Sequence, residues 1–254
     1  MPAATFRFYE ELNDFLPPQR RKREFELPLH GPASVKDMIE SAGVPHTEID
    51  LILANGRSVG FGYGVADGDR ISVYPVFESM DISPVSVLRP EPLRRTRFVL
   101  DTHLGKLSRY LRLLGFDSLY RNDYADATLA EIASSGDKRI LLTRDLGLLK
   151  RKCITHGYFV RDTDPDRQMV EVLDRFDLRG AIRPFTRCTH CNHAIGNVER
   201  ESVRARVPRG VFLRYAHFAA CDGCGRVYWP GSHYDGMRAR MARWLDNRPE
   251  RLSA

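Results

Sequence analysis

The sequence predicts a multidomain chain of mixed α/β and α+β class, and three observations lead to that prediction. Apolar and polar residues alternate in short segments over the first eighty residues, with one helical segment among them. From residue 97 onward, short apolar segments alternate with amphipathic ones. Two Cys-x-x-Cys pairs follow, separated by 29 residues. We therefore expect an α+β unit, then a parallel α/β sheet, then a small metal-binding unit.

The first unit is predicted to span residues 1–80. Alternating apolar and polar residues predict strands at residues 4–10, 23–29, 49–54 and 70–76 and around Val59. A short helix is predicted over residues 34–40, with Ser34 as its N-cap and Gly43 after its end. This order of strands and helix is that of a ubiquitin-like β-grasp fold.

Residues 68–75 (GDRISVYP) resemble the sulfur-carrier branch of that fold. A carrier ends in a free Gly-Gly shortly after this point, whereas here residues 76–79 (VFES) continue the chain. We therefore expect no sulfur-carrier chemistry at this position. An accessory or binding role remains for the domain, which includes recruitment of a protein partner.

Residues 81–96 hold Pro84, Pro90 and Pro92 and few large apolar residues, a composition typical of a linker. The second unit is predicted over residues 97–182. Its expected strands lie at residues 98–100, 118–120, 140–142 and 158–160, and its expected helices at 104–114, 126–135, 146–152 and 165–176. Short apolar strands that alternate with amphipathic helices indicate a parallel sheet covered on both faces.

Acidic residues follow the strands of this sheet, at the ends where parallel sheets bind ligands. Asp101 and Asp145 come after the first and third strands, and Asp123 and Asp162 come after the second and fourth. Carboxylate oxygens suit Mg²⁺ or Mn²⁺, which can generate a hydroxide nucleophile for attack on a phosphodiester. We predict a catalytic site formed by Asp101, Asp123 and Asp145. The alternative is that each Asp only caps the next helix, as we expect for Asp126.

Four basic residues lie near these acids in the sequence: Lys106, Arg109, Arg112 and Arg144. The first three recur every third residue of the helix predicted over 104–114, on the side opposite its leucines. Residues 1–80 hold 8 Lys and Arg against 12 Asp and Glu, whereas the rest of the chain holds 31 against 21. This basic part favours RNA as a partner, with the four residues on its phosphates. The alternative is an ordinary solvated surface.

Two segments carry a more specific likeness. Residues 101–117 (DTHLGKLSRYLRLLGFD) and 141–145 (LLTRD) resemble the Mut-seven C-terminal RNase family, which is similar to the PIN nucleases. The likeness continues through both cysteine pairs to residues 227–234 (VYWPGSHY), and bacterial members carry a ubiquitin-like domain in front. The resemblance implies a PIN-like fold and a metal-dependent endoribonuclease for single-stranded or structured RNA, with Asp101 and Asp145 at the family's acidic positions.

The second-helix acid typical of PIN enzymes has no unambiguous counterpart in this sequence. One alternative is therefore a protein that binds structured RNA, such as transfer RNA or ribosomal RNA, without cutting it. A second alternative is an adaptor that recruits a protein through the acidic β-grasp domain. Metal-dependent cleavage of RNA would separate the enzyme from both.

The third unit, a zinc ribbon, is predicted over residues 183–254. Its two knuckles offer four thiolates to one structural Zn²⁺ ion: Cys188, Cys191, Cys221 and Cys224. Four protein ligands leave no open position, so this zinc is not expected to be catalytic. His190 and His193 are expected at the surface or on RNA. Residues 192–220 should form a hairpin or helix, and residues 234–247 a helix that packs or lines phosphates.

Arginines interleave with aromatic residues around the cysteine pairs, a pattern that suits phosphate contacts and base stacking. Several of these rings are also needed for the core of the small unit. The sequence has no apolar run of about 18 residues and no secretion-signal pattern at residue 1. The paired cysteines then indicate a reduced compartment, with Cys153 as a buried or spare thiol. We expect a cytoplasmic protein that does not contact membranes.

Overall fold

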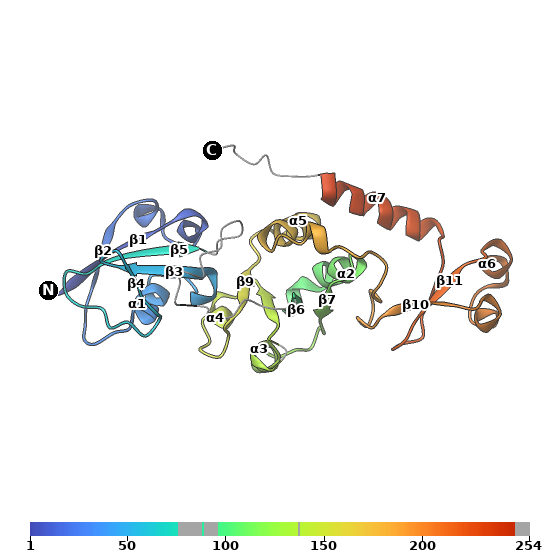
Figure 1. The fold of residues 1–254 in the computed structure, drawn as a ribbon, viewed down its shortest axis with the longest axis horizontal. Helices are drawn as coiled ribbons and strands as arrows, with labels where there is room; N and C mark the ends of the chain where they lie inside the picture. The colour runs from blue at the N-terminus through green and yellow to red at the C-terminus, as the bar shows by residue number, and fades with distance from the viewer. Residues whose placement is uncertain (76–87, 89–95, 137, 247–254) are drawn as a thin grey trace. The chain divides into compact units, whose positions relative to one another are not determined.

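The computed structural model describes residues 1–75, 88, 96–136 and 138–246 (Figure 1). The predicted linker at residues 81–96 lies outside the described residues except for its positions 88 and 96. Two compact units are present. One combines Met1–Arg95 with Asp126–Phe159, and the other combines Thr96–Ala125 with Val160–Ala254. The domain boundaries at residues 80, 96 and 182 stay predictions.

The N-terminal part of the chain forms a mixed five-stranded sheet. Its strands are β1 (Ala3–Phe8), β2 (Phe25–Pro28), β3 (Ile49–Ala54), β4 (Arg57–Ser58) and β5 (Arg70–Pro75). Their order is β2-β1-β5-β3-β4, with β1 parallel to β5 and the other pairs antiparallel. Alternate residues of β1 are buried against α1 (Val35–Ser41), which Ser34 caps by accepting the Asp37 amide over 3.2 Å. The predicted β-grasp fold is confirmed.

Three short 3-10 helices that the pattern did not indicate join these elements: Glu10–Phe15, Pro18–Arg20 and His46–Glu48. The third lies against a later segment of the same compact unit. His46 Nε2 lies 2.7 Å from the Ile154 carbonyl oxygen, and Glu48 Oε1 accepts the Phe159 amide over 2.6 Å. Lys150 Nζ donates to the Glu40 carbonyl over 2.8 Å. Buried polar contacts therefore hold the β-grasp domain to residues 150–159.

The middle of the chain forms a four-stranded sheet with helices, as predicted. Its strands are β6 (Arg97–Leu100), β7 (Asp117–Leu119), β8 (Ile140–Thr143) and β9 (Gly157–Phe159), in the order β7-β6-β8-β9. The pairs β6–β7 and β8–β9 are parallel. The helices are α2 (Gly105–Leu113), α3 (Asp126–Ser134), α4 (Leu146–Leu149) and α5 (Pro165–Arg175), and the 3-10 turn Thr102–Leu104 precedes α2. Helix α4 is shorter than the 146–152 predicted.

The last part of the chain forms a small antiparallel sheet and a long helix. The strands are β10 (Ile195–Val198), β11 (Phe218–Cys221) and β12 (Val227–Tyr228), and the helix is α7 (Ser232–Asp246). Between β10 and β11 lie the 3-10 turn Arg200–Val203 and α6 (Arg209–Arg214). Trp244 of α7 is 2 % exposed and donates to Asp166 Oδ1 over 2.7 Å, which fixes α7 on α5. Within the part of the chain that the structure describes, none of the helices has the length and hydrophobicity of a membrane span.

Candidate functional site

The four predicted zinc ligands lie together. Their sulfur atoms are all within 4.8 Å of one another, with 3.3 Å between Cys191 and Cys221 and 3.6 Å between Cys188 and Cys224. Four sulfurs about 2.3 Å from a tetrahedral ion would lie about 3.8 Å apart. The set therefore fits one zinc ion. No other group of three or more His, Cys, Asp or Glu side chains in the described part of the chain lies close enough for one ion.

Hydrogen bonds to its sulfur atom favour the thiolate form of Cys188. Cys188 Sγ lies 3.0 Å from the Tyr228 hydroxyl and accepts the Cys191 amide over 3.4 Å. Burial alone would raise the pKa of Cys188, but these donors outweigh it and lower the pKa to about 6. Burial raises the pKa of the Cys191 thiol, and the neighbouring Cys221 sulfur raises it further. Because zinc binds thiolates, an ion at this site favours loss of that proton.

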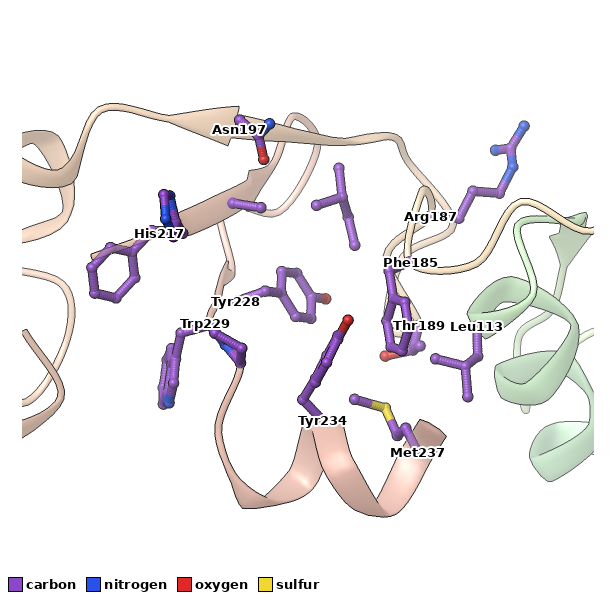
Figure 2. Close-up of a pocket in the computed structure, with 14 residues that line it drawn as sticks. Leu113, Phe185, Arg187, Thr189, Asn197, His217, Tyr228, Trp229, Tyr234 and Met237 are labelled. Atoms are coloured by element: carbon purple, nitrogen blue, oxygen red, sulfur yellow. The ribbon is translucent and has the colours of Figure 1, made fainter. Parts of the chain in front are cut away.

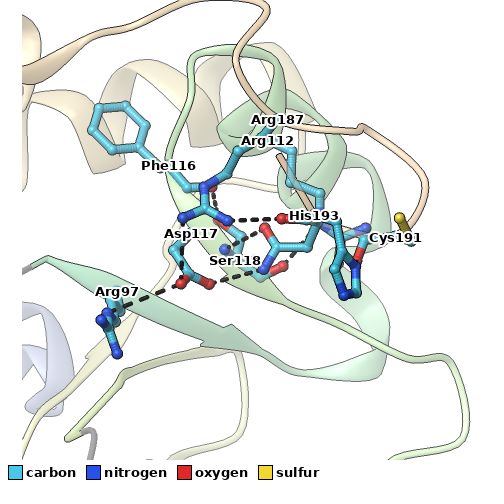
Figure 3. A network of polar contacts seen from close by, with 9 residues as sticks. Arg97, Arg112, Phe116, Asp117, Ser118, Arg187, Cys191 and His193 are labelled. Carbon is cyan, nitrogen blue, oxygen red and sulfur yellow. Dashed lines mark hydrogen bonds and ion pairs between the residues drawn. The ribbon is translucent and has the colours of Figure 1, made fainter. Parts of the chain in front are cut away.

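A buried arginine joins the first knuckle to α2 and β7 (Figure 3). Arg112 Nε donates to the Ser118 carbonyl over 2.8 Å. Its Nη1 donates to the His190 carbonyl over 2.9 Å and to the Thr189 carbonyl over 3.3 Å. Arg112 is 3 % exposed. Backbone carbonyls thus occupy its Nε and Nη1 donors, which favours a structural role, and the prediction that Arg112 binds RNA phosphates stays a prediction.

Asn192 and Asp117 complete this junction, and Figure 3 labels Asp117 beside Ser118. Asn192 Oδ1 accepts the Ser118 amide over 2.9 Å, and its Nδ2 donates to Asp117 Oδ1 over 2.8 Å. Arg187 Nη1 donates to the Asn192 carbonyl over 2.7 Å, and its Nη2 lies 3.5 Å from Asp117 Oδ2. Asn192 has a φ of +70°, a backbone conformation that Asn adopts more readily than most residues. The zinc knuckle is therefore bonded to the edge strand β7.

The two acids that follow β6 and β8 both bond to backbone amides. Asp101 is 6 % exposed and accepts the amide of Thr102 over 2.6 Å and its hydroxyl over 3.2 Å. Asp145 is exposed, and its Oδ1 accepts the amides of Gly147 over 2.7 Å and Leu148 over 3.4 Å at the start of α4. Both residues therefore act as N-caps, which was the alternative to a catalytic role.

The other three acids are held differently. Asp123 is exposed and accepts two hydrogen bonds from Arg121, at 2.9 and 2.8 Å, which lower the pKa of its carboxyl group. Asp126 is the first residue of α3, and its carboxylate lies 3.4 Å from Arg151. Asp162 Oδ1 accepts a backbone amide over 2.8 Å. Among the described residues, the one group of side chains close enough to share an ion is the cysteine cluster, and none of these carboxylates belongs to it. The site of Asp101, Asp123 and Asp145 stays a prediction.

The comparisons with known families cover nearly the whole chain. A family model described as the Mut7-C RNAse domain matches residues 96–241, more than half of the chain. The chain belongs to the Mut7-C RNAse domain family. A second model, described as Mut7-C ubiquitin, matches residues 1–81. The predicted family and its N-terminal ubiquitin-like domain are thus confirmed, whereas a protein partner for that domain stays a prediction. No curated protein and no solved structure matches the chain.

Within the Mut7-C RNAse domain, the remaining predicted basic residues differ in exposure. Lys106 and Arg109 are exposed on α2, whereas Arg144 is half-buried. Arg109 lines a recess of about 410 Å³, together with Arg240 and Arg243 of α7. This basic recess is a candidate nucleic-acid interface, because clustered Arg side chains bind phosphates.

The sequence predicted a helix at residues 234–247 that packs or lines phosphates, but Arg240 and Arg243 were not named. The signal for them was present, because arginines recur through the predicted helix at residues 234–247. Asn192 and Asp117 gave no such signal. A polar residue beside a cysteine pair or at the start of a strand is ordinary, and only the fold of the Mut7-C RNAse domain brings these two together.

Proposed function

We propose that this Mut7-C protein is an RNA-directed, metal-dependent endoribonuclease. The observation that carries the proposal is the match of residues 96–241 to a domain described as an RNAse. The same stretch holds Asp101 and Asp145, which directly follow β6 and shortly follow β8. Ligands of parallel sheets bind at the carboxyl ends of the strands. The substrate class is RNA, and the reaction is hydrolysis of a phosphodiester.

Asp101 and Asp145 would hold a Mg²⁺ or Mn²⁺ ion, with Asp123 as a third ligand. Carboxylate oxygens are the donors that these ions prefer. Both hydrogen bonds that Asp145 accepts from the described residues end on Oδ1, so its Oδ2 is the oxygen that would ligate a cation. Asp123 would first have to release Arg121, which makes it the weaker candidate. When bound, the ion supplies an activated water and positive charge at the phosphate.

Lys106 and Arg109 would hold the RNA backbone beside this site, together with Arg144. The first two are exposed on α2, one turn or more after Asp101 along the chain. Exposed cations on a helix bind phosphates without regard to base sequence, so they fix the position of the strand. We leave Arg112 out of this set, because it is buried and its guanidinium donates to backbone carbonyls of the first knuckle.

The test compares RNA cleavage by the wild type, Asp145→Asn and Asp177→Asn in the presence of Mn²⁺. Loss of a metal ligand removes several kcal/mol of transition-state stabilisation, so Asp145→Asn should cut at least about 100-fold more slowly. Asp177 is exposed and follows α5, so its Asn variant makes the same charge change as a control. Equal cutting by wild type and Asp145→Asn, or intact RNA with the wild type, would overturn the proposed ribonuclease activity.

The second candidate is a protein that binds structured RNA, such as transfer RNA or ribosomal RNA, without cutting it. The observation that favours it is that Asp101 and Asp145 already cap the segments that follow them. Both acids then have a sufficient reason to be present without a metal ion. Tight RNA binding that weakens steeply with salt, together with intact RNA in Mn²⁺, would select this candidate.

A further inference from the structure

The small sheet of the C-terminal part has two unlike faces. On one face Val198, Phe218 and Val227 pack in the core of the ribbon. On the other face Asn197, Ala219 and Tyr228 stand in one row, because Ala219 pairs with both of the others across the strands. Directly paired residues point to the same side of a sheet. The small Ala219 side chain therefore leaves a hollow between Asn197 and the Tyr228 ring.

This hollow is a cavity of about 280 Å³ with mostly apolar walls (Figure 2). Phe185 and Tyr234 line it opposite the sheet, with their ring centroids 4.6 Å apart. Leu113 and Met237 close the side toward α2 and α7. Its volume is close to the lower limit of about 300 Å³ for small-molecule sites, so it suits one flat ring system rather than a large ligand.

The apolar cavity adjoins the basic recess. The two share Leu113, Thr189 and Met237 as lining residues. The recess adds Arg109 and Arg243, both exposed, and none of the described residues that line either hollow is Asp or Glu. Aromatic walls beside exposed arginines are the arrangement that holds a base together with its phosphates.

We propose that the apolar cavity accepts one unpaired nucleobase of an RNA strand while Arg109 and Arg243 hold a neighbouring phosphate in the basic recess. The proposal rests on the proposed function, because RNA is the ligand. The rings of Tyr228, Tyr234 and Phe185 offer stacking surface to any base. Asn197 and His217 at the sheet side offer hydrogen-bonding groups to the base edge. Neither Asp101 nor Asp145 is among the residues that line this subsite.

The test measures the affinity of the full chain for a labelled single-stranded RNA by fluorescence anisotropy, without added Mg²⁺ or Mn²⁺. Ala219→Leu fills the cavity and removes no ring, and Tyr234→Ala removes one ring while Tyr234→Phe keeps it. Losing one stacked base should weaken binding about 5- to 100-fold in the first two variants, with Tyr234→Phe at the wild-type affinity. Arg243→Gln should lower the slope of log affinity against log salt by about 0.7.

A second measurement replaces the RNA by an abasic version of the same strand and needs no protein variant. The wild type should bind it about 5- to 100-fold more weakly than the parent strand, and Ala219→Leu should show less of this difference. If the wild type binds both strands equally, or if Ala219→Leu and Tyr234→Ala bind like the wild type, the nucleobase subsite is wrong while RNA binding stands. If the wild type binds no RNA, the proposed function fails as well. Zinc content and near-ultraviolet circular dichroism show whether each variant is folded.

Discussion

At the scale of the residue, α2 shows what a sequence pattern can and cannot give. The leucines of the predicted helix 104–114 are buried, and Lys106 and Arg109 are exposed, as the pattern indicated. Arg112 belongs to the same basic row but is buried, because carbonyls more than seventy positions later in the chain cover it. Helical periodicity tells which face is polar. It does not tell whether a distant segment will pack on that face.

Because Arg112 is buried and Arg109 is exposed, the same substitution should affect stability at the first position and RNA binding at the second. Arg112→Ala should lower the free energy of unfolding by about 3 kcal/mol, because it leaves buried carbonyls without a donor. Arg109→Ala should change it by less than about 0.5 kcal/mol and weaken RNA binding. Urea unfolding followed by circular dichroism measures the first quantity. Equal stability losses would contradict the assigned roles.

At the scale of the element, most strands and helices were predicted within a few residues, because alternation and helical spacing are local signals. The 3-10 helices and the strands of the ribbon were not. The turn His46–Glu48, for example, is held by Ile154 and Phe159, about 110 positions away. Segments whose shape depends on such distant partners carry no local pattern that identifies them.

The cysteine pairs are the clearest case of a site that spacing alone predicted, because two Cys-x-x-Cys turns can complete one tetrahedral shell. Cys224→Ser should lose the zinc ion, whereas Cys153→Ser, outside the cluster, should retain one per chain. Since the knuckle holds Arg112 and Asn192, zinc loss should also speed amide exchange at Ser118. Elemental analysis and hydrogen exchange measure both effects. A Cys224→Ser protein with full zinc would contradict the site.

At the scale of the whole molecule, short motifs identified the family, and the two family models confirm that reading. The role of the carboxylates that follow β6 and β8 was harder to predict, because a strand-terminal Asp serves equally well as a helix cap or a metal ligand, and the sequence is the same in both cases. The apolar cavity could not be predicted from the sequence, since it depends on the strand register that places Ala219 between Asn197 and Tyr228.

The most direct test of the central claim is the chemistry of the cut RNA ends in water enriched in oxygen-18. The full chain is incubated with single-stranded RNA and Mn²⁺, and the fragments are analysed by mass spectrometry. Hydrolysis by a metal-activated water predicts linear terminal phosphates that carry one solvent oxygen, and no such fragments with Asp145→Asn. A 2′,3′-cyclic phosphate without solvent oxygen, or RNA that stays whole, would contradict the account.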